Sequence, residues 1–269
     1  GYNSEEKIKN NILKIFIYYS ILSLGIFLLL NITGIRLFNS LNISMTLISG
    51  GGFLPTNSLT NIISSNFQKI AFIFSLLLSM FNFYIVFNIF NKKILIRDHK
   101  EDMYLMFLTI ILIVFIYFNH NSGLDLIIGV ISSLATSGLT LMKADNLSLY
   151  FLFITLIGGS LVSNTSGIKL ARFYILLKIA SAEIMKLISP NSVINKTIFN
   201  SEKKITDDNV KISFLIFISF FLSLFILSSF LVLDNIGFEK SFKLSILTLT
   251  NTVNSELFNM ENLNFANLL

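Results

Sequence analysis

Long apolar stretches alternate along this chain with shorter ones that end in loops rich in glycine, serine and threonine. A helix of about 20 apolar residues spans a bilayer, whereas runs of about 10–14 are more typical of segments that enter it only partway. The predicted spans are Ile12–Ile32, Ile70–Phe90, Met103–Phe118, a broken span that starts near Leu147 and resumes over Ile168–Ile188, and Ile212–Leu233. The short helices are predicted at Leu37–Ile48, Leu124–Ala135 and Phe238–Leu249.

The composition of the chain indicates a lipid environment. Hydrophobic residues make up 54% of the 269 residues and charged residues only 13%, whereas a soluble domain is roughly 45–50% apolar and about 25% charged. So few charges cannot cover a water-soluble surface, but lipid allows apolar side chains to face outward. The sequence therefore predicts an all-α membrane protein. Because it contains no cysteine, disulfides and thiolate metal sites are excluded.

The order of the predicted elements repeats. A span, a short helix, a polar loop and a second span recur with a period of roughly 100 residues. We therefore expect one unit at 1–100, a second at 101–200 with a broken second span, and a third at 201–269 that lacks its last span. Because the first residue is Gly1 rather than methionine, the chain is expected to be a fragment or a processed form.

Basic residues are distributed unevenly between the two sides of the predicted membrane. Of the 20 Lys and Arg residues, five lie on the side of the short helices: Arg36, Lys69, Lys143, Lys240 and Lys243. Because cytoplasmic loops carry an excess of Lys and Arg, we expect the N-terminus in the cytoplasm and the short helices entering from the outer face. The net charge of +5 requires no nucleic-acid partner.

The polar loops after the short helices have the chemistry of a cation pathway. The C-terminal end of a helix carries partial negative charge, which favours a cation. Glycine adopts backbone angles that turn carbonyl oxygens toward an axis, and rings of such oxygens replace the hydration shell of potassium in channels. Ser49–Phe53 and Thr136–Thr140 contain no carboxylate, and a potassium filter needs none. The alternative is that these loops are plain turns between helices.

Four motifs resemble those of a known family. Ile48–Phe53 (ISGGGF) resembles the I-S-T-G-G-F filter, and Ala135–Thr140 (ATSGLT) the T-T-G-F-T filter, of the Trk/Ktr/HKT potassium transporter membrane subunits. Gly158–Lys169 resembles G-G-x-x-G-S-T-A-G-G-I-K, where that family breaks a span with an intramembrane loop. The similarity continues through Arg172, Glu183 and Pro190, with Ser189 where histidine is usual.

The resemblance implies four span–pore helix–span units around a central pore, like those of a potassium channel, of which residues 1–100, 101–200 and 201–269 would be the second, the third and part of the fourth. It also implies a transporter rather than an enzyme. It implies that potassium, the only metal ion expected, meets the filter residues Ser49, Gly50, Gly51, Gly52, Thr136, Ser137, Gly138, Asn251 and Thr252. It implies a gate formed by Gly158, Gly159, Ser163, Asn164, Thr165, Ser166, Gly167, Lys169 and Arg172. It also implies a multi-pass protein of the plasma (bacterial inner) membrane and no covalent cofactor. The implied partners are the lipid bilayer, a second copy in a homodimer, and a cytoplasmic nucleotide-binding regulatory subunit.

The chain departs from the family pattern at several positions. The fourth filter of the family usually reads N-x-G-P, but here it is Asn251-Thr252-Val253-Asn254, with valine where glycine is expected. A β-branched residue is strained at left-handed backbone angles, so this strand is expected to be less tightly formed, less selective or degenerate. Gly50 stands where threonine is usual, and Ser166 replaces the first of two glycines.

Several residues allow more than one interpretation. The Gly158–Gly167 segment is either a gate or small-residue helix packing. Lys169 and Arg172 either set an electrostatic barrier near the pore or extend to the cytoplasmic interface. The basic stretch 169–211 either docks the regulatory partner or contacts anionic lipid. Asp125 is expected in the first turn of a short helix, and Asp98, Glu101 and Asp102 in a solvated cytoplasmic loop with Lys100.

Two other functions remain open. A secondary transporter with broken helices would bind a small solute at mid-membrane, and a structural subunit of a membrane complex would transport nothing. The first would favour an ionisable residue inside a span, and between Ile12 and Phe90 we find one only at the span ends and at Arg36. The altered fourth filter favours the second slightly.

Overall fold

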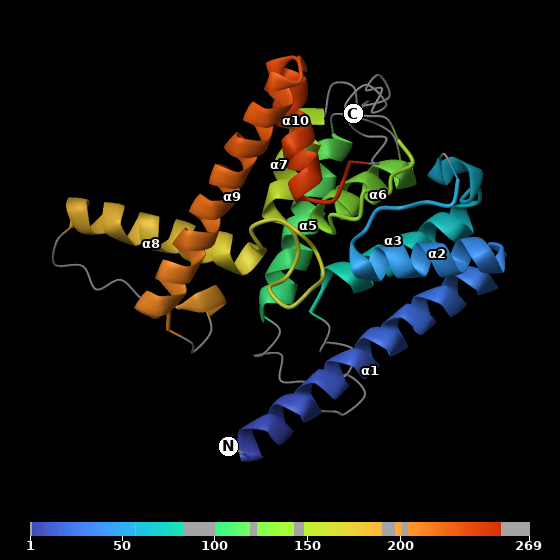
Figure 1. Cartoon of the computed structure of the whole chain (residues 1–269), viewed down its shortest axis with the longest axis horizontal. Helices are drawn as coiled ribbons and strands as arrows, with labels where there is room; N and C mark the ends of the chain where they lie inside the picture. The colour runs from blue at the N-terminus through green and yellow to red at the C-terminus, as the bar shows by residue number, and fades with distance from the viewer. Residues whose placement is uncertain are drawn as a thin grey trace.

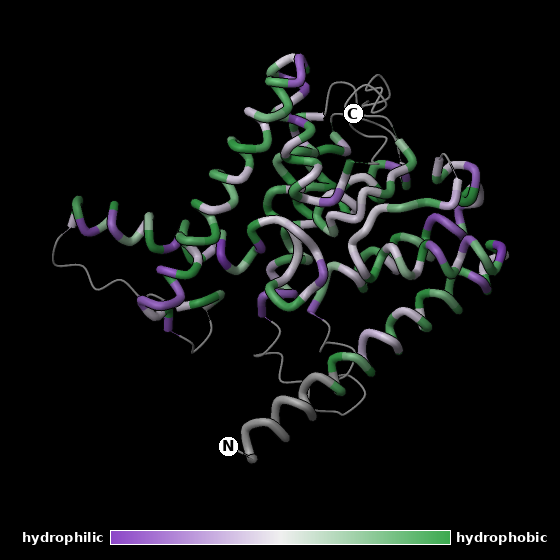
Figure 2. The backbone as a smooth tube through the Cα atoms, in the orientation of Figure 1, coloured by the Kyte–Doolittle hydropathy of each residue, from purple (hydrophilic) through white to green (hydrophobic). Residues whose placement is uncertain are grey.

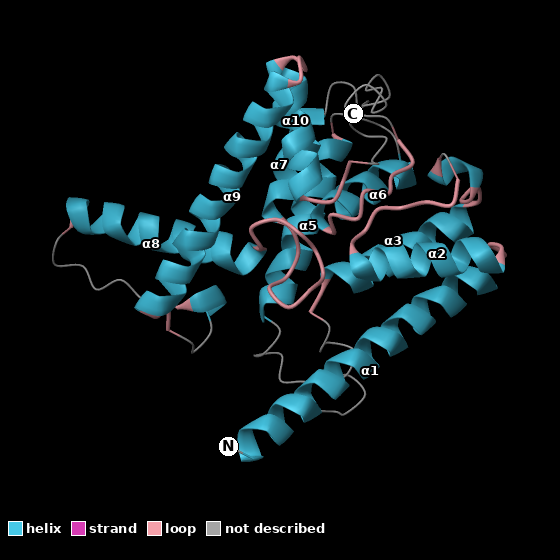
Figure 3. Cartoon of the chain, viewed as in Figure 1, coloured by secondary structure: helices cyan, strands magenta, loops and turns pink. Residues whose placement is uncertain are grey.

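The computed structural model describes residues 2–56, 58–82, 100–118, 123–142, 148–189, 197–200 and 204–253. These residues are mostly helical (Figure 3). The α-helices are α1 Tyr2–Ile32, α2 Leu37–Ser49, α3 Asn66–Met80, α5 Lys100–Tyr117, α6 Gly123–Leu134, α7 Ser148–Ile157, α8 Leu170–Ile188, α9 Asp207–Leu233 and α10 Phe238–Leu249. Two short 3-10 helices, η1 Leu59–Asn61 and η3 Ile198–Asn200, lie between them.

The helices lie close to the predicted apolar stretches, with one exception. The three short helices are confirmed as α2, α6 and α10, and α10 has the predicted bounds. The expectation of one continuous span over Ile70–Phe90 is wrong, because α3 ends at Met80 and Phe81 has extended backbone angles. At this end, the carbonyl oxygen of Met80 accepts from the N–H of Ser160 at 3.1 Å. The last residue of α3 is therefore bonded to a loop that is distant in sequence.

The short helices pack among the longer ones. α2 lies against α1 and α3, α6 lies against α3, α5 and α7, and α10 lies against α9 and α7. In Figure 1 the chain segments after α2, α6 and α10 gather near the middle of the molecule, beside the loop that joins α7 to α8. α8 points away from this middle region. A single cluster of buried apolar side chains, including Phe72, Leu126 and Phe151, joins the first two short helices to their neighbours.

The outer surface of the helices is apolar, as lipid exposure requires. Within the described residues, two helices are long and apolar enough to cross a membrane, over Ile15–Ile32 and Asp207–Leu233. Only 17% and 11% of these segments are buried, which is too little for core helices of a soluble protein. Figure 2 shows the hydrophobic colour along most of α9, with hydrophilic residues at its two ends. The prediction of an all-α membrane protein is thus confirmed.

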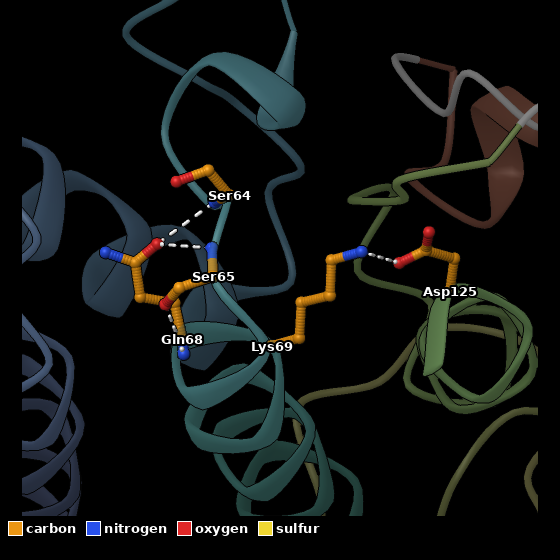
Figure 4. Close-up of polar contacts among 5 residues, drawn as sticks. All are labelled: Ser64, Ser65, Gln68, Lys69 and Asp125. Atoms are coloured by element: carbon orange, nitrogen blue, oxygen red, sulfur yellow. Dashed lines mark hydrogen bonds and ion pairs between the residues drawn. The ribbon is translucent and has the colours of Figure 1, made fainter. Parts of the chain in front are cut away.

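An ion pair joins the first turns of α3 and α6. The Nζ of Lys69 lies 2.6 Å from Oδ1 of Asp125 (Figure 4). Lys69 follows a capping box in which the Ser65 hydroxyl accepts from the Gln68 N–H and the Gln68 side chain accepts from the Ser65 N–H. Asp125 lies in the first turn of α6, as predicted. The pair therefore fixes the start of a short helix against the capped start of its neighbour.

We expect this ion pair to contribute modestly to stability. A double-mutant cycle of Lys69→Met and Asp125→Asn should give a coupling energy of about 0.2–1 kcal/mol, because the side chains are 19% and 35% exposed and solvent screens the attraction. The measurement is thermal unfolding in detergent, and the coupling should fall when salt is raised. The control is the more exposed Lys186–Glu183 pair of α8, at 3.1 Å. A coupling at Lys69–Asp125 no larger than at this control would contradict the expectation.

Candidate functional site

The three short helices end with the same backbone geometry. The residue after each helix, or one further on, has a left-handed φ: Gly50 at 66°, Thr136 at 47° and Asn251 at 56°. The N–H of the following residue then donates to a carbonyl five positions back, in the bonds Gly51–Thr46 (3.0 Å), Ser137–Ser132 (3.1 Å) and Thr252–Leu247 (2.8 Å). Such bonds satisfy carbonyls that a helix end leaves without partners. We call residues 50–53, 136–139 and 251–253 the first, second and third tips.

The tips differ two residues later. Gly52 and Gly138 again have left-handed φ values, of 69° and 68°. Val253 occupies the equivalent position in the third tip and is not among the described residues with positive φ. The left-handed backbone angles that a β-branched side chain disfavours are therefore absent at Val253, where the sequence lacks glycine.

The tips contact one another through their main chains. A Cβ on Gly52 would lie 2.9 Å from the carbonyl oxygen of Ser137 and 3.1 Å from that of Asn251. A Cβ on Gly138 would lie 3.2 Å from the same Asn251 oxygen and 3.3 Å from Cα of Thr252. A Cβ at Gly52 would force the neighbouring main chain to shift, and one at Gly138 would be tighter than most real contacts, so glycine favours the close approach of the tips. Three loops that are far apart in sequence thus bring backbone oxygens to one place.

Polar side chains line this region while remaining buried. Thr136, Ser137 and Thr252 are at most 1% exposed. The Ser137 and Ser132 hydroxyls lie 2.9 Å apart, and those of Thr252 and Thr250 lie 2.8 Å apart. Ser137 and Thr252 are therefore each fixed by a hydroxyl on their own helix or the residue after it.

One predicted filter residue lies apart from the others. Ser49 is the last residue of α2, is exposed, and lines a groove of about 410 Å³ together with Phe38, Met45 and Phe53. The structure brings together the tip residues that follow it, but the Ser49 side chain faces this groove.

The broken span is a loop with a closed base. α7 ends at Ile157 and α8 begins at Leu170. Across the base, the Ile168 N–H donates to the Leu156 carbonyl at 3.0 Å and the Leu170 N–H to the Gly159 carbonyl at 3.1 Å. Gly158 and Gly167 have φ values of 70° and 84°. A Cβ on Gly158 would contact the Ser166 carbonyl oxygen, and one on Gly167 would lie 2.9 Å from the Leu156 oxygen.

The middle of this loop has hydrogen bonds to two of the tips and to the end of α2. The Ser166 N–H donates to Oγ1 of Thr136 at 2.7 Å, and Nδ2 of Asn251 donates to the Ser166 hydroxyl at 3.3 Å. The Asn164 side chain donates to the carbonyl of Ile48 at the end of α2. The predicted gate and filter segments are thus adjacent, and the contacts between them are hydrogen bonds.

Lys169 lies inside the loop. Its Nζ donates to the Ser163 carbonyl and to Oγ1 of Thr165, both at 2.9 Å, and to the Ser163 hydroxyl at 3.3 Å. The residue is only 9% exposed, so the interpretation in which it extends to the cytoplasmic interface is wrong. Within the loop, Thr165 also accepts from the Gly159 N–H at 3.0 Å. Arg172 follows one turn later on α8 and is partly buried.

Two acidic residues that the sequence analysis placed in a solvated loop are part of this site. α5 begins at Lys100, and Asp102 is 4% exposed, so the solvated-loop expectation is wrong for it. Oε1 of Glu101 accepts from the Leu161 N–H at 2.7 Å, and Oδ1 of Asp102 accepts from the Asn82 N–H at 3.0 Å. In the sequence, these two residues are a pair of acids directly before an apolar stretch. Because an exposed helix start has the same pattern, the sequence does not distinguish the two cases.

Known proteins share both the sequence pattern and the fold. The chain is 30% identical over 228 residues to an uncharacterized cation transporter of Methanocaldococcus jannaschii, which covers 82% of this chain and 45% of the relative. It is 31% identical over 264 residues to the Trk system potassium uptake protein TrkG of Escherichia coli, covering 90% of this chain and 52% of that protein. No family model matches the chain.

The fold comparison agrees with the sequence comparison. The structure superposes on the crystal structure of the potassium transporter TrkH from Vibrio parahaemolyticus with a TM-score of 0.80 at 18% identity. The match covers 91% of this chain and 56% of that one. The chain therefore has the TrkH fold and spans about half the length of the relatives it matches.

Proposed function

We propose that this chain, a member of the Trk/Ktr/HKT family by sequence and fold, forms part of a pathway that carries potassium ions across the plasma membrane. The observation that carries the proposal is the close main-chain contact among the three tips. Gly52 and Gly138 have no Cβ at positions where one would lie 2.9 Å from the Ser137 carbonyl oxygen and 3.2 Å from the Asn251 carbonyl oxygen, so the tips can pack closely there. Irregular polar backbone at membrane depth is tolerated where protein buries it or it lines water.

In this proposal the tip residues supply the oxygens that replace the hydration shell of the ion. The short helices end at the tips, so their partial negative charge acts there. The residues proposed to meet the ion are those of the predicted filter, with Ser49 at its edge. Potassium is the transported ion, and no further cofactor is needed for such a pathway. The three units at 1–100, 101–200 and 201–269 would each contribute one tip.

The α7–α8 loop is proposed as the gate of this pathway. It has hydrogen bonds to two tips and to the end of α2, and Lys169 holds its second half. A loop held by a few separate bonds can leave without unfolding the helices around it. When the loop lies against the tips, it separates the tips from the side of the molecule where α8 begins.

A growth assay tests the transport function. Cells that lack potassium uptake should grow on low potassium when they express the full-length protein, and growth should be lost with Gly138→Asp, which places a side chain against the third tip. The matched control is Gly34→Asp, since Gly34 also has a left-handed φ (88°) but has nothing within 4 Å of its Cβ position. Uptake of another solute without potassium dependence would support a secondary transporter instead. No uptake of any kind would support a structural subunit.

We further propose that the protein works as a homodimer with a cytoplasmic nucleotide-binding partner. The support is the family resemblance and the exposed end of α8, where residues 183–189 are all exposed and Lys186 lies in the last turn. The N-terminus would then be cytoplasmic. Co-purification with a nucleotide-binding subunit that is lost when Lys178 and Lys186 are replaced by glutamate would test this docking face against lipid contact.

A further inference from the structure

Three chain segments meet at the entrance of the α7–α8 loop. The end of α3 supplies the Met80 carbonyl, which accepts from the Ser160 N–H at 3.1 Å. The start of α5 supplies two carboxylates, of which Glu101 accepts from the Leu161 N–H at 2.7 Å and Asp102 from the Asn82 N–H at 3.0 Å. The three bonds link residues that lie 20, 60 and 80 positions apart in sequence. They form one continuous junction.

The junction satisfies backbone groups that the broken helices leave open. Neither Asn82 nor Leu161 lies in a helix, so their N–H groups need acceptors from elsewhere. Acidic residues in a first turn usually interact with the start of their own helix. Here Glu101 and Asp102 are adjacent and accept from two different segments, as expected for neighbours that point in different directions on a helix. A hydrogen bond to a carboxylate is also stronger than one to a neutral acceptor.

We propose that Glu101 and Asp102 are positioning residues that clamp the first half of the α7–α8 loop to the end of α3. This inference rests on the proposed role of that loop as a gate. The clamp and Lys169 divide the loop between them. Glu101 holds residue 161, and Lys169 holds residues 163 and 165. The hydrogen bonds to the tips are made by Ser166, which lies beyond these residues.

The packing around the clamp leaves little freedom for its partners. A Cβ on Gly159 would lie 2.7 Å from the Met80 carbonyl oxygen and 2.8 Å from Cγ2 of Thr165. Met80 and Ser160 are fully buried. The entrance of the loop is therefore wedged between α3 and the second half of the loop. The Glu101 carboxylate closes it from the α5 side, so the loop's first half can move only after that bond breaks.

The test measures exposure of the loop directly. The chain has no cysteine, so Ser160→Cys gives a single target in this segment, next to Leu161 and fully buried while the loop is clamped. A membrane-impermeant thiol reagent is applied to the full-length protein in vesicles. Labelling should become about tenfold faster or more in Glu101→Ala, the factor that corresponds to the loss of one charge-assisted hydrogen bond. Glu101→Gln should label at a rate between those of the wild type and Glu101→Ala, because its amide oxygen still accepts from Leu161 but carries no charge.

Two further variants complete the design. Asp207→Asn is the matched control, because Asp207 is also a first-turn acid but is exposed at the start of α9. It should label at the wild-type rate. Asp102→Ala removes the second carboxylate of the junction and should also speed labelling, which keeps the test informative where Glu101→Ala fails to reach the membrane. Thermal unfolding of each variant separates release of the loop from a general loss of fold.

The outcomes separate this inference from the proposed function. Faster labelling in Glu101→Ala or Asp102→Ala, with partial rescue in Glu101→Gln, supports the clamp. Labelling at the wild-type rate in both alanine variants, or equal acceleration in Asp207→Asn, overturns it. Potassium uptake is measured in the same vesicles. If potassium is taken up but the alanine variants label at the wild-type rate, only the clamp is rejected. If the alanine variants label faster but no potassium is taken up, the transport function is rejected and the clamp remains as a structural device.

Discussion

Replacing Gly52 by alanine is expected to lower potassium uptake about tenfold or more. The Cβ of alanine would lie 2.9 Å from the Ser137 oxygen, which is closer than real Cβ contacts allow, and 3.1 Å from the Asn251 oxygen, which is tighter than most. These are backbone atoms, so the tips themselves must separate. The left-handed φ of 69° adds a steric cost of about 1–2 kcal/mol for a residue with a side chain. The measurement is the initial rate of potassium uptake in cells.

The control for this prediction is Gly34→Ala. Gly34 has a φ of 88°, so alanine meets similar backbone strain there, but nothing lies within 4 Å of its Cβ position. Uptake by Gly34→Ala should stay close to that of the wild type. If Gly52→Ala transported normally at normal expression, or if both variants lost uptake equally, contact among the tips would have no special role.

Deleting Ser163–Ser166 is expected to raise potassium flux about fivefold or more. The deletion removes the bonds to Thr136, Asn251 and Ile48 that hold the loop against the tips. Each bond contributes about 0.5–1.5 kcal/mol. Losing them therefore shifts the equilibrium between the closed and open gate by a free energy typical of the coupling between two sites. Flux is measured as potassium uptake per molecule of protein in the membrane.

The deletion also removes the acceptors of Lys169, which needs its own control. A buried ammonium without partners destabilises a protein, so Lys169→Met is combined with the deletion to remove that cost. Both versions should show raised flux. Unchanged or lower uptake in both, with normal expression, would reject a gating role for the loop.

The sequence predicted the helices and tips well because their signals are local. Apolar length gave α2, α6 and α10 within about one residue, and glycine marked the left-handed positions at Gly52 and Gly138. Valine at position 253 correctly marked a tip that differs from the other two. Each of these features depends on residues that are near one another in the chain. The family resemblance rests on the same segments.

The contacts between distant segments could not be predicted in this way. The end of α3 at Met80 lies inside an apolar stretch that reads as continuous, and the helix ends where the Met80 carbonyl bonds to a loop residue. Glu101 and Asp102 have the sequence pattern of a solvated helix start, yet their acceptor atoms meet Leu161 and Asn82. Lys169 is basic at a predicted interface, yet its partners are in its own loop. Only the assembled fold brings these partners together.

The unequal φ pattern of the tips has a consequence for any ion that passes them. The first two tips turn twice, at residues 50 and 52 and at residues 136 and 138, whereas the third turns once, at Asn251. A cation held there would therefore not meet a symmetric ring. The first two tips would present their oxygens from a backbone that turns twice, and the third would present them along a straighter strand.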